Sequence, residues 1–506
     1  MLPIITSEKS KQIDSAVIEN LRISSGELMM ENAARSALEI IRSHFGLNFR
    51  NCLVLCGVGN NGGDGFALAR LLSEYIPVDI YVIGDLSKMS FETKMNYEFA
   101  KNNDKKINIT HIQTEEALSN LPFNYDIIID ALIGVGGNEN LRGLVIPLLK
   151  MANRAQALKV AIDVPTGLNA NTGKFHPDVF QSDATITMFA KKRAMLDKRL
   201  LHIFGEIYVA YLGFDRSQVM NLIDEWEVAP QDIHLLNQIA VDANKYDCGR
   251  IAILAGSDIY PGAAAIAANA ACTAGAGLVH LFSTVFHPSL RAEVIQRKLT
   301  PNSNGFISSR NFDFLANELR KFDVVAIGPG IGNDTETLEL VSKLIDVLPC
   351  KIILDADALR VVNYREKLSK NIVITPHLGE FARILALDKT EIEYNRIDLA
   401  LSFAQKFNTN ILLKGSTTIV TNGNFLYYST SGNKGLASGG TGDALTGIIA
   451  AFAHRCDDLA LASAIGAFIH GLAADLYASE VSTESLTASE IINYLGKAIS
   501  AAYKSC

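Results

Sequence analysis

The chain has 506 residues, a formal net charge of -8, 48% hydrophobic residues and 20% charged residues. This length exceeds one ordinary domain, so at least two hydrophobic cores are expected, and the composition excludes an intrinsically disordered chain. A mildly acidic balance without a Lys/Arg-rich block gives no reason to expect nucleic-acid binding. We find no apolar run of the ~20 residues that a membrane span needs and no signal-peptide pattern, so we expect neither membrane insertion nor export.

The seven cysteines form no CxxC pair and no zinc-type quartet. Reduced thiols in a cytoplasmic protein are therefore predicted.

Helical spacing of apolar residues predicts two helices, at 7–20 and 27–43, before any strand. From there the chain alternates short apolar runs with helical segments such as 66–74. This alternation is typical of a parallel sheet with helices on both faces. The predicted strands of this first half are 51–56, 78–83, 125–130 and 160–164.

The pattern restarts after a polar segment, 224–235, which contains Pro230 and has no strand or strong helical period. We therefore expect two doubly wound α/β domains, 1–226 and 227–506, with ligands outside the carboxyl ends of the strands. The predicted strands of the second half are 250–255, 278–282, 324–327, 351–354, 372–375 and 411–413.

The first strand is followed by a glycine-rich loop, residues 57–65, that contains GxGxxG. A nicotinamide dehydrogenase would need an acidic residue at the end of the second strand, whereas Asp79 lies at its start and Asp85 beyond it. Two amides and the carboxylate of Asp64 in the loop suit a hydroxylated ring, a ribose or a cation better than a pyrophosphate. A turn without a ligand is the alternative, but five glycines carry an entropic cost that a simple connector would avoid.

Two later loops also begin with a carboxylate at a strand end, Asp130 before GVGG and Asp163 before PTGL. A single strand-end Asp is usually a cap or a turn former. Three such carboxylates, with Asp64, meet at one edge of the sheet and indicate a site.

The motifs GNNGGDG, DALIGVG and DVPTGL, in this order, resemble those of the NAD(P)H-hydrate epimerase family. The early segment MENA, from Met30, and the segment TITM, which precedes Lys192, are similar to that family too. Met188 and Ala194 stand where the family has Phe and Gly.

This resemblance implies a Rossmann-like epimerase fold in which Asp163 is catalytic and faces the hydrated ring. Lys192 lies close by, although the adjacent Lys191 leaves open which lysine serves the site. A potassium ion is implied at Asn61, Asp130 and Thr166, whose oxygens are hard ligands. The implied substrate-binding residues are Asn60, Asn61, Gly62, Gly63, Asp64, Gly134, Val135, Gly136, Gly137, Asn138, Glu139, Asn140 and Asp163.

The second half contains a glycine-rich helix start, GLASGGTGDALTG, over residues 435–447. Backbone N–H groups at such a start hold a transferring phosphoryl group, and Asp443 is placed to take a proton from an attacking hydroxyl. A purely structural glycine turn is the alternative. No GxxxxGK[ST] is present, so a P-loop is excluded.

Further polar loops follow other strands of this half. GPGIG over 328–332 allows close backbone approach, and Asp355 and Asp357 suit either magnesium binding or helix capping. A histidine is most often structural, but the position of His377 in TPHLGE at the sheet edge favours substrate contact.

GSxxYPGA, GAGLV, GPGIG, DADAL, TPHLGE, LKGST and GGTGD together resemble the NAD(P)H-hydrate dehydratase family of the ribokinase-like superfamily. Asn244 stands where that family has a histidine. The resemblance implies that Asp443 is catalytic, that magnesium is required, and that the hydrated ring lies near Ala263, Gly332, His377 and Asp443. The implied nucleotide-binding residues are Lys414, Gly415, Ser416, Thr417, Asn433, Lys434, Gly435, Leu436, Ala437, Ser438, Gly439, Gly440, Thr441 and Gly442.

Together the resemblances imply a cytoplasmic, homo-oligomeric enzyme that repairs hydrated NADH and NADPH. One half would epimerise the R and S hydrates (NADHX and NADPHX), and the other would dehydrate the S form with ADP or ATP. Two alternatives are a vitamin-precursor kinase with a regulatory N-terminal domain, and a non-catalytic partner-binding protein.

Overall fold

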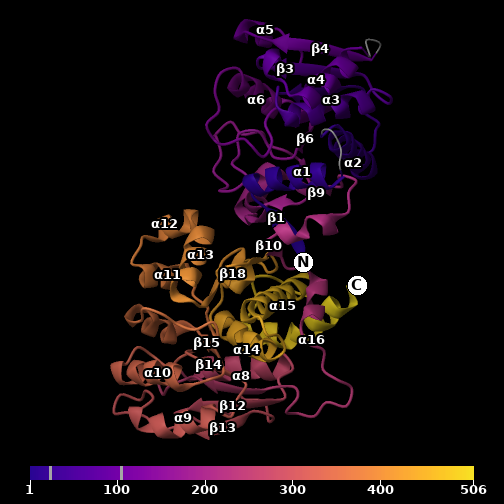
Figure 1. Cartoon of the computed structure of the whole chain (residues 1–506). Coiled ribbons are helices and arrows are strands. Elements are labelled where there is room, and N and C mark those ends of the chain that lie inside the picture. Colours follow the sequence, from indigo (N-terminus) through magenta and orange to yellow (C-terminus); the bar gives the residue numbers. More distant parts are fainter. Residues whose placement is uncertain (22–25, 103–105, 506) are drawn as a thin grey trace. The chain divides into compact units, whose positions relative to one another are not determined.

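The computed structural model describes residues 1–21, 26–102 and 106–505 (Figure 1). The chain forms two compact units: residues 3–223, and residues 1–2 together with 224–506. Each unit is described below by itself, as the N-terminal unit and the C-terminal unit.

The N-terminal unit is built on a seven-stranded sheet with the order β4-β3-β2-β5-β6-β7-β9, in which every neighbouring pair is parallel. The strand order reverses between β2 and β5, so the loops that follow these two strands diverge and leave a crevice. The strands are β2 (Cys52–Cys56), β3 (Val78–Ile83), β4 (Ile107–Ile112), β5 (Ile127–Ala131), β6 (Leu158–Ile162), β7 (Ala184–Met188) and β9 (Glu206–Ala210).

Helices cover both faces of this sheet. One core, which includes Ile41, Phe66 and Ile129, lies on the side of α2 and α3, and another, which includes Leu148, lies on the side of α6. The predicted early helices are confirmed as α1 and α2. The helices are α1 (Ser7–Leu21), α2 (Glu27–Phe45), α3 (Asn60–Leu72), α4 (Phe91–Lys101), α5 (Glu115–Ser119), α6 (Val145–Arg154) and α7 (Leu201–Phe204).

Helix α3 begins inside the glycine motif, at Asn60, and not at residue 66 as expected. A Cβ atom on Gly62 would lie 1.9 Å from the carbonyl oxygen of Gly57, and one on Gly65 would lie 2.5 Å from Cβ of Ala131. The glycines therefore let the first turn of the helix pack directly against the sheet. The helix N-terminus and the ends of β2 and β5 meet at one place.

A short parallel pair, β1 (Leu2–Ile5) with β8 (Lys191–Lys192), fixes the position of one expected site residue. Ile5 is paired with Lys192, and Ile4 with Lys191. Since side chains alternate along a strand, the two lysines point to opposite sides, and only Lys192 is buried.

In the C-terminal unit the strands run in the order β13-β12-β11-β14-β15-β16-β17-β18-β19-β10. The sheet is parallel from β13 to β17, continues through antiparallel β18 and β19, and ends with β10 parallel to β19. The strands are β10 (Glu225–Glu227), β11 (Arg250–Leu254), β12 (Leu278–Ser283), β13 (Ile295–Lys298), β14 (Val324–Ile327), β15 (Lys351–Leu354), β16 (Ile372–Ile374), β17 (Asn410–Leu413), β18 (Thr418–Thr421) and β19 (Leu426–Ser429).

The segment 224–235 is not the strandless linker that we expected, because β10 lies within it. The two glutamates of this strand are buried, and hydroxyl groups satisfy them: Tyr428 donates to Glu225 at 2.7 Å and Thr430 donates to Glu227 at 2.8 Å. Because its buried residues are polar, this strand lacks the apolar pattern from which strands are predicted.

The core of this unit is formed largely by α8, α14 and α15, which contribute many small buried residues (Figure 1). A Cβ on Gly447 of α14 would lie 2.1 Å from the carbonyl oxygen of Ala267 in α8, so glycine permits this close helix contact. The helices are α8 (Pro261–Thr273), α9 (Phe312–Leu319), α10 (Thr335–Val347), α11 (Leu378–Leu385), α12 (Lys389–Tyr394), α13 (Arg396–Phe407), α14 (Thr441–His454), α15 (Leu459–Glu480) and α16 (Ala488–Lys504).

The expectation that no segment is long and apolar enough to span a membrane is wrong for α15. Its 22 residues meet that test by length and composition. Most of the helix is buried, against α14 and α16 among others, which accounts for its apolar sequence as that of a core helix. The predicted fold class, two doubly wound α/β domains, is confirmed.

Candidate functional site

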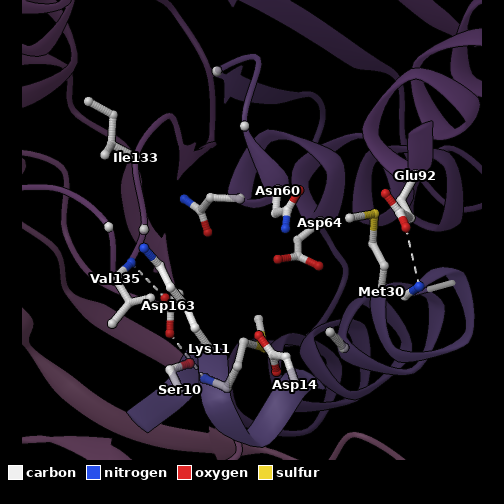
Figure 2. Close-up of a pocket in the computed structure, with 18 of the residues that line it drawn as sticks. Ser10, Lys11, Asp14, Met30, Asn60, Asp64, Glu92, Ile133, Val135 and Asp163 are labelled. Carbon is white, nitrogen blue, oxygen red and sulfur yellow. Dashed lines mark hydrogen bonds between the residues drawn. The ribbon is translucent and has the colours of Figure 1, made fainter. Parts of the chain in front are cut away.

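A pocket of about 690 Å³ opens at the carboxyl ends of β2, β5 and β6 in the N-terminal unit (Figure 2). Helices α1 and α2 and the start of α3 complete its walls. Its polar lining includes a lysine, two amides and four carboxylates. These residues are Ser10, Lys11, Asp14, Asn60, Asn61, Asp64, Glu92 and Asp163.

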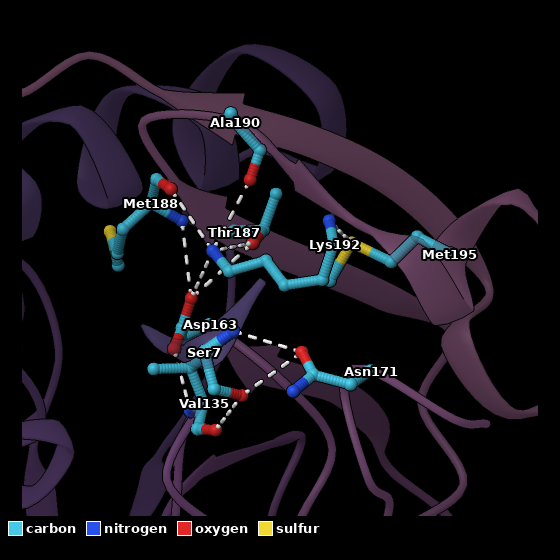
Figure 3. Close-up of polar contacts among 9 residues, drawn as sticks. All are labelled: Ser7, Val135, Asp163, Asn171, Thr187, Met188, Ala190, Lys192 and Met195. Atoms are coloured by element: carbon cyan, nitrogen blue, oxygen red, sulfur yellow. Dashed lines mark hydrogen bonds and ion pairs between the residues drawn. The ribbon is translucent and has the colours of Figure 1, made fainter. Parts of the chain in front are cut away.

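Asp163 and Lys192 form a buried ion pair at the edge of this pocket (Figure 3). Nζ of Lys192 lies 2.6 Å from Oδ1 of Asp163 and 2.6 Å from Oγ1 of Thr187, and it also donates to two backbone carbonyls. The other oxygen of Asp163 accepts from the N–H of Val135 at 2.8 Å. Asp163 has a φ of 66°, a left-handed conformation that is uncommon for a residue with a side chain and is concentrated at functional sites.

Burial disfavours the ionised form of Asp163, but the ammonium of Lys192 outweighs it and lowers the pKa of Asp163 below its ordinary value. The site therefore holds a carboxylate that stays charged in a place from which water is largely excluded. Of the two adjacent lysines, Lys192 is the one that points to this carboxylate, and its Nζ lies 2.6 Å from Oδ1 of Asp163.

Two further carboxylates face the same pocket, and their environments differ from that of Asp163. Burial, followed by repulsion from Asp163, raises the pKa of Asp14 to about 6. Burial, followed by repulsion from Asp163 and Asp14, raises the pKa of Asp64 well above its ordinary value. Within the described residues, neither Asp14 nor Asp64 has a hydrogen-bond donor or a cationic partner. The sequence analysis missed Asp14, because a lone carboxylate on an amphipathic helix carries no motif.

Asp130 lies beneath the pocket and is fully buried. It accepts from the backbone N–H and the hydroxyl of Thr166, at 2.7 and 2.8 Å, and from the N–H of Leu132 at 3.1 Å. Burial raises the pKa of Asp130 to about 6 despite these hydrogen bonds. The amide of Asn61 donates to the carbonyl of Ile162 at 3.2 Å and accepts from the N–H of Gly134 at 3.3 Å.

The expected substrate residues of this unit fall into two groups. Asn60, Asn61, Asp64 and the segment 134–136 line the pocket. Gly62 and Gly63 are buried in α3, and residues 137–140 lie outside the lining; in that segment Asn138 accepts from the N–H of Asn140 at 2.8 Å. Glu92, Lys11 and Ser10 line the pocket without having been expected there.

The C-terminal unit has its own ion pair, between a buried carboxylate and a partly buried lysine. Nζ of Lys414 lies 2.8 Å from Oδ1 of Asp355, and the hydroxyls of Thr375 and Thr446 each donate to Asp355 at 2.7 Å. Burial opposes the charge on Asp355, yet Lys414 and the hydroxyls lower the pKa of this carboxyl. Asp355 is therefore held as an anion at the end of β15.

Asp443 is the third residue of α14, whose N-cap residue Gly440 has a φ of 84°. Burial and then repulsion from Asp355 and Asp357 raise the pKa of Asp443 to about 7, although Lys414 acts in the opposite sense. A carboxyl group with this pKa at a helix start is suited to accept a proton near neutral pH.

His377 has a structural role, which was the less favoured of the two interpretations of its sequence motif. Its Nδ1 accepts from the N–H of Gly379 at 2.9 Å and of Glu380 at 3.2 Å, so it caps α11. Its side chain is nevertheless 60% exposed. Nearby, the N–H of Gly332 donates to Asp357 at 2.9 Å, which ties two of the expected loops together. Ala263 lies in the first turn of α8.

Of the expected nucleotide segments, 414–417 forms the connection between β17 and β18, and 433–442 leads into the start of α14. Asn433 accepts from the N–H of Gly435 at 3.0 Å and donates to Asp475 at 2.9 Å. Arg396 donates to the carbonyl of Thr417 at 2.9 Å. These contacts shape the backbone and leave the N–H groups at the start of α14 without side-chain caps.

Comparison with known families agrees with this division. A model described as "YjeF-related protein N-terminus" matches residues 26–194, and one described as "NAD(P)H-hydrate dehydratase" matches residues 251–497. Solved structures that the chain resembles include a ribokinase-like superfamily protein of Enterococcus faecalis (23% identity, TM-score 0.49, 55% of this chain and 96% of that one). They also include the ADP/ATP-dependent NAD(P)H-hydrate dehydratase of Bacillus subtilis (26% identity, TM-score 0.45, 53% and 95%).

Curated relatives align along almost the whole chain. The bifunctional NAD(P)H-hydrate repair enzyme of Thermofilum pendens is 32% identical over 94% of this chain and 92% of its own length. The enzyme of the same description from Escherichia coli K12 is 32% identical over 94% and 89%. Because this identity extends across both units, the chain belongs to the family of bifunctional NAD(P)H-hydrate repair enzymes.

Proposed function

We propose that the domain of residues 1–226 epimerises the hydrates of NADH and NADPH, and that the domain of residues 227–506 dehydrates the S hydrate with ADP or ATP. The observation that carries this proposal is that each unit combines an ion pair between a buried Asp and a Lys with a carboxyl group whose pKa is raised. Asp14 and Asp64 accompany Asp163–Lys192, and Asp443 accompanies Asp355–Lys414. Groups whose pKa values are pushed apart are the usual machinery of proton transfer.

In the first domain the reaction inverts the carbon that carries the ring hydroxyl. A proton must be given to the departing hydroxyl, and another must be taken from the water that replaces it. Asp163 is suited to take a proton, because Lys192 keeps it ionised in a buried setting. Asn60, Asn61, Asp64 and the segment 134–140 would hold the nicotinamide and its ribose.

A potassium ion would be held by Asn61, Asp130 and Thr166. The donor set fits such an ion, because Asp130 is a buried carboxylate that no Lys or Arg of the described residues contacts, and burial raises its pKa to about 6. Amide, carboxylate and hydroxyl oxygens are hard ligands. A bound cation would supply a fixed positive charge beneath the pocket.

In the second domain Asp443 would take the proton of the ring hydroxyl while the hydroxyl oxygen attacks the terminal phosphoryl group of the nucleotide. The N–H groups of residues 439–442 would stabilise the transferring charge. The C–O bond then breaks and phosphate leaves, while the ring nitrogen supplies the electron pair. Loss of a proton from the neighbouring carbon to solvent restores the dihydronicotinamide. Ala263, Gly332 and His377 would lie near this ring, and the segments 414–417 and 433–442 near the nucleotide.

Magnesium would balance the phosphate charge of the nucleotide. Within the described residues no group of three or more His, Cys, Asp and Glu side chains is arranged to hold a metal. The phosphate oxygens would therefore provide much of its coordination. Repulsion among Asp355, Asp357 and Asp443 around the single Lys414 fits the presence of a cation there.

The described cysteines are free thiols, which suits the reducing cytoplasm. We propose a cytoplasmic homo-oligomer whose partners are the small molecules NADHX, NADPHX and ADP or ATP, with no nucleic acid and no membrane.

The test is recovery of dihydronicotinamide absorbance from a mixture of both NADHX epimers with magnesium and ADP or ATP. Wild type is expected to restore the full signal. With Asp163→Asn, the absorbance is expected to recover rapidly to near half of the full signal and then to stop, because only the S epimer is consumed. With Asp443→Asn, no recovery is expected. Absence of recovery by wild type with either nucleotide would contradict the proposed function and favour a small-molecule kinase.

A further inference from the structure

The pocket of the N-terminal unit contains a carboxylate with no structural contact of its own. Asp14 projects from α1 into the open space that Asp64 and Asp163 also face (Figure 2). Within the described residues it accepts no hydrogen bond and forms no ion pair. Its neighbours Ile13 and Val17 are buried and attach the helix to the unit, so Asp14 is held in place by a packed helix.

The chemistry of inversion explains why a second carboxyl group would be needed here. The hydroxyl leaves one face of the ring, and water adds to the other. Asp163 belongs to the loop after β6, and Asp14 belongs to α1, so the two groups reach the pocket from separate elements. We propose that Asp14 is a second catalytic residue of the epimerase and acts on the ring face opposite Asp163; this inference rests on the proposed function.

Protonated Asp14 gives its proton to the ring hydroxyl, the C–O bond breaks and water leaves, while the lone pair of the ring nitrogen forms a C=N⁺ bond. Water then adds to the same carbon from the other face and gives a proton to Asp163, and the electron pair returns to nitrogen. The opposite epimer uses the same two groups in reversed roles.

The environments of the carboxyl groups support this division of work. Lys192 keeps Asp163 ionised, whereas burial, followed by repulsion from Asp163, raises the pKa of Asp14 to about 6, so Asp14 holds a proton more readily. Burial and the neighbouring carboxylates also raise the pKa of Asp64. A carboxyl group with the pKa of Asp14 is suited to proton transfer near neutral pH.

The experiment follows single epimers of NADHX in H₂¹⁸O, measuring inversion and ¹⁸O uptake separately above the uncatalysed rates. Wild type is expected to show both. In Asp14→Asn, inversion should fall ~10²- to 10⁴-fold, the range for loss of a general acid or base. Uptake of ¹⁸O without inversion should persist, at a reduced rate, in the epimer whose hydroxyl faces Asp163, because Asp163 that has taken a proton from solvent can remove and return water on its own face.

Glu19→Gln is the matched control, since it removes an exposed carboxylate from the same helix outside the pocket. It should keep wild-type inversion. Dehydration of the pure S epimer by Asp14→Asn should equal that of wild type and report an intact C-terminal unit. Inversion by Asp14→Asn within threefold of wild type, or an equal fall of inversion and ¹⁸O uptake, would overturn the role of Asp14. Absence of inversion in wild type would instead overturn the proposed function, and this inference with it.

Discussion

Nζ of Lys192 lies 2.6 Å from Oδ1 of Asp163, and both side chains are buried. Lys192→Met would leave the carboxylate without the positive charge that keeps its pKa low. We expect the pKa of Asp163 to rise, epimerisation to be lost, and the N-terminal unit to lose about 3–5 kcal/mol of stability, as when a buried pair is broken. Calorimetric unfolding and the inversion assay measure the two effects.

The double variant Lys192→Met with Asp163→Asn should regain part of that stability, because no buried charge is left unpaired. Lys191→Met, which alters the adjacent lysine, should keep epimerisation. Folding lowers the pKa of Asp163 below 3.8, so the ionised carboxylate stabilises the folded unit at pH values above 3.8. This stabilisation is lost as the pH falls through the lower pKa that Asp163 has in the folded state. An unchanged inversion rate in Lys192→Met would contradict this account of the pair.

The dehydratase should show the titration of Asp443. A base must be ionised to accept a proton, and this carboxyl has a pKa raised to about 7. We therefore expect kcat/KM for the S hydrate to rise with pH through about 7 and then level. Asp443→Asn should lower kcat by ~10²-fold or more at every pH. The control Asp457→Asn, at an exposed site beyond α14, should follow the wild-type profile; a profile that is flat between pH 6 and 8 would argue against Asp443 as the base.

Removal of Lys414 should move that profile. Its ammonium lowers the pKa of Asp443 and pairs with Asp355 at 2.8 Å. In Lys414→Met the rise of kcat/KM is expected at a higher pH than in wild type, because Asp443 then faces two carboxylates without the lysine. Lys497→Met, which breaks an exposed pair with Glu480 outside the expected nucleotide segments, should leave the midpoint unchanged. A midpoint that stays in place in Lys414→Met would show that the lysine does not act on Asp443.

Potassium should stabilise the N-terminal unit through Asp130. A ligand that binds only the folded state raises stability by mass action, so unfolding temperature should increase with KCl relative to NaCl at equal ionic strength. Asp130→Asn should abolish that difference, since it removes the buried negative charge. Asp126→Asn is a suitable control, because that carboxylate is paired with Arg50 on the surface. Equal responses of wild type to KCl and NaCl would exclude a selective potassium site.

The positions of most strands could be predicted, because continuous apolar runs identify buried parallel strands without any knowledge of their neighbours. Their order in the sheet then brings Asp130, Asp163 and the glycine motif to one edge. That is why the loops after β2, β5 and β6 were recognisable as parts of one site.

Other features depend on contacts that periodicity does not reveal. The start of α3 at Asn60 depends on glycines that pack against Gly57 and Ala131, and β10 depends on hydroxyl partners for two buried glutamates. Asp14 becomes part of the pocket only because α1 folds across the sheet edge. The pairing of Lys414 with Asp355 likewise joins loops 59 residues apart.

His377 offers a way to separate a structural role from substrate contact. Its Nδ1 caps α11, and its exposed ring is free to meet a ligand as well. His377→Asn should keep the cap, because an Asn side chain accepts from the same N–H groups, whereas His377→Ala should cost about 0.5–2 kcal/mol. If the ring also contacts the hydrate, the KM of the dehydratase rises in both variants. If the ring only caps α11, the KM of His377→Asn stays at the wild-type value and only His377→Ala loses stability.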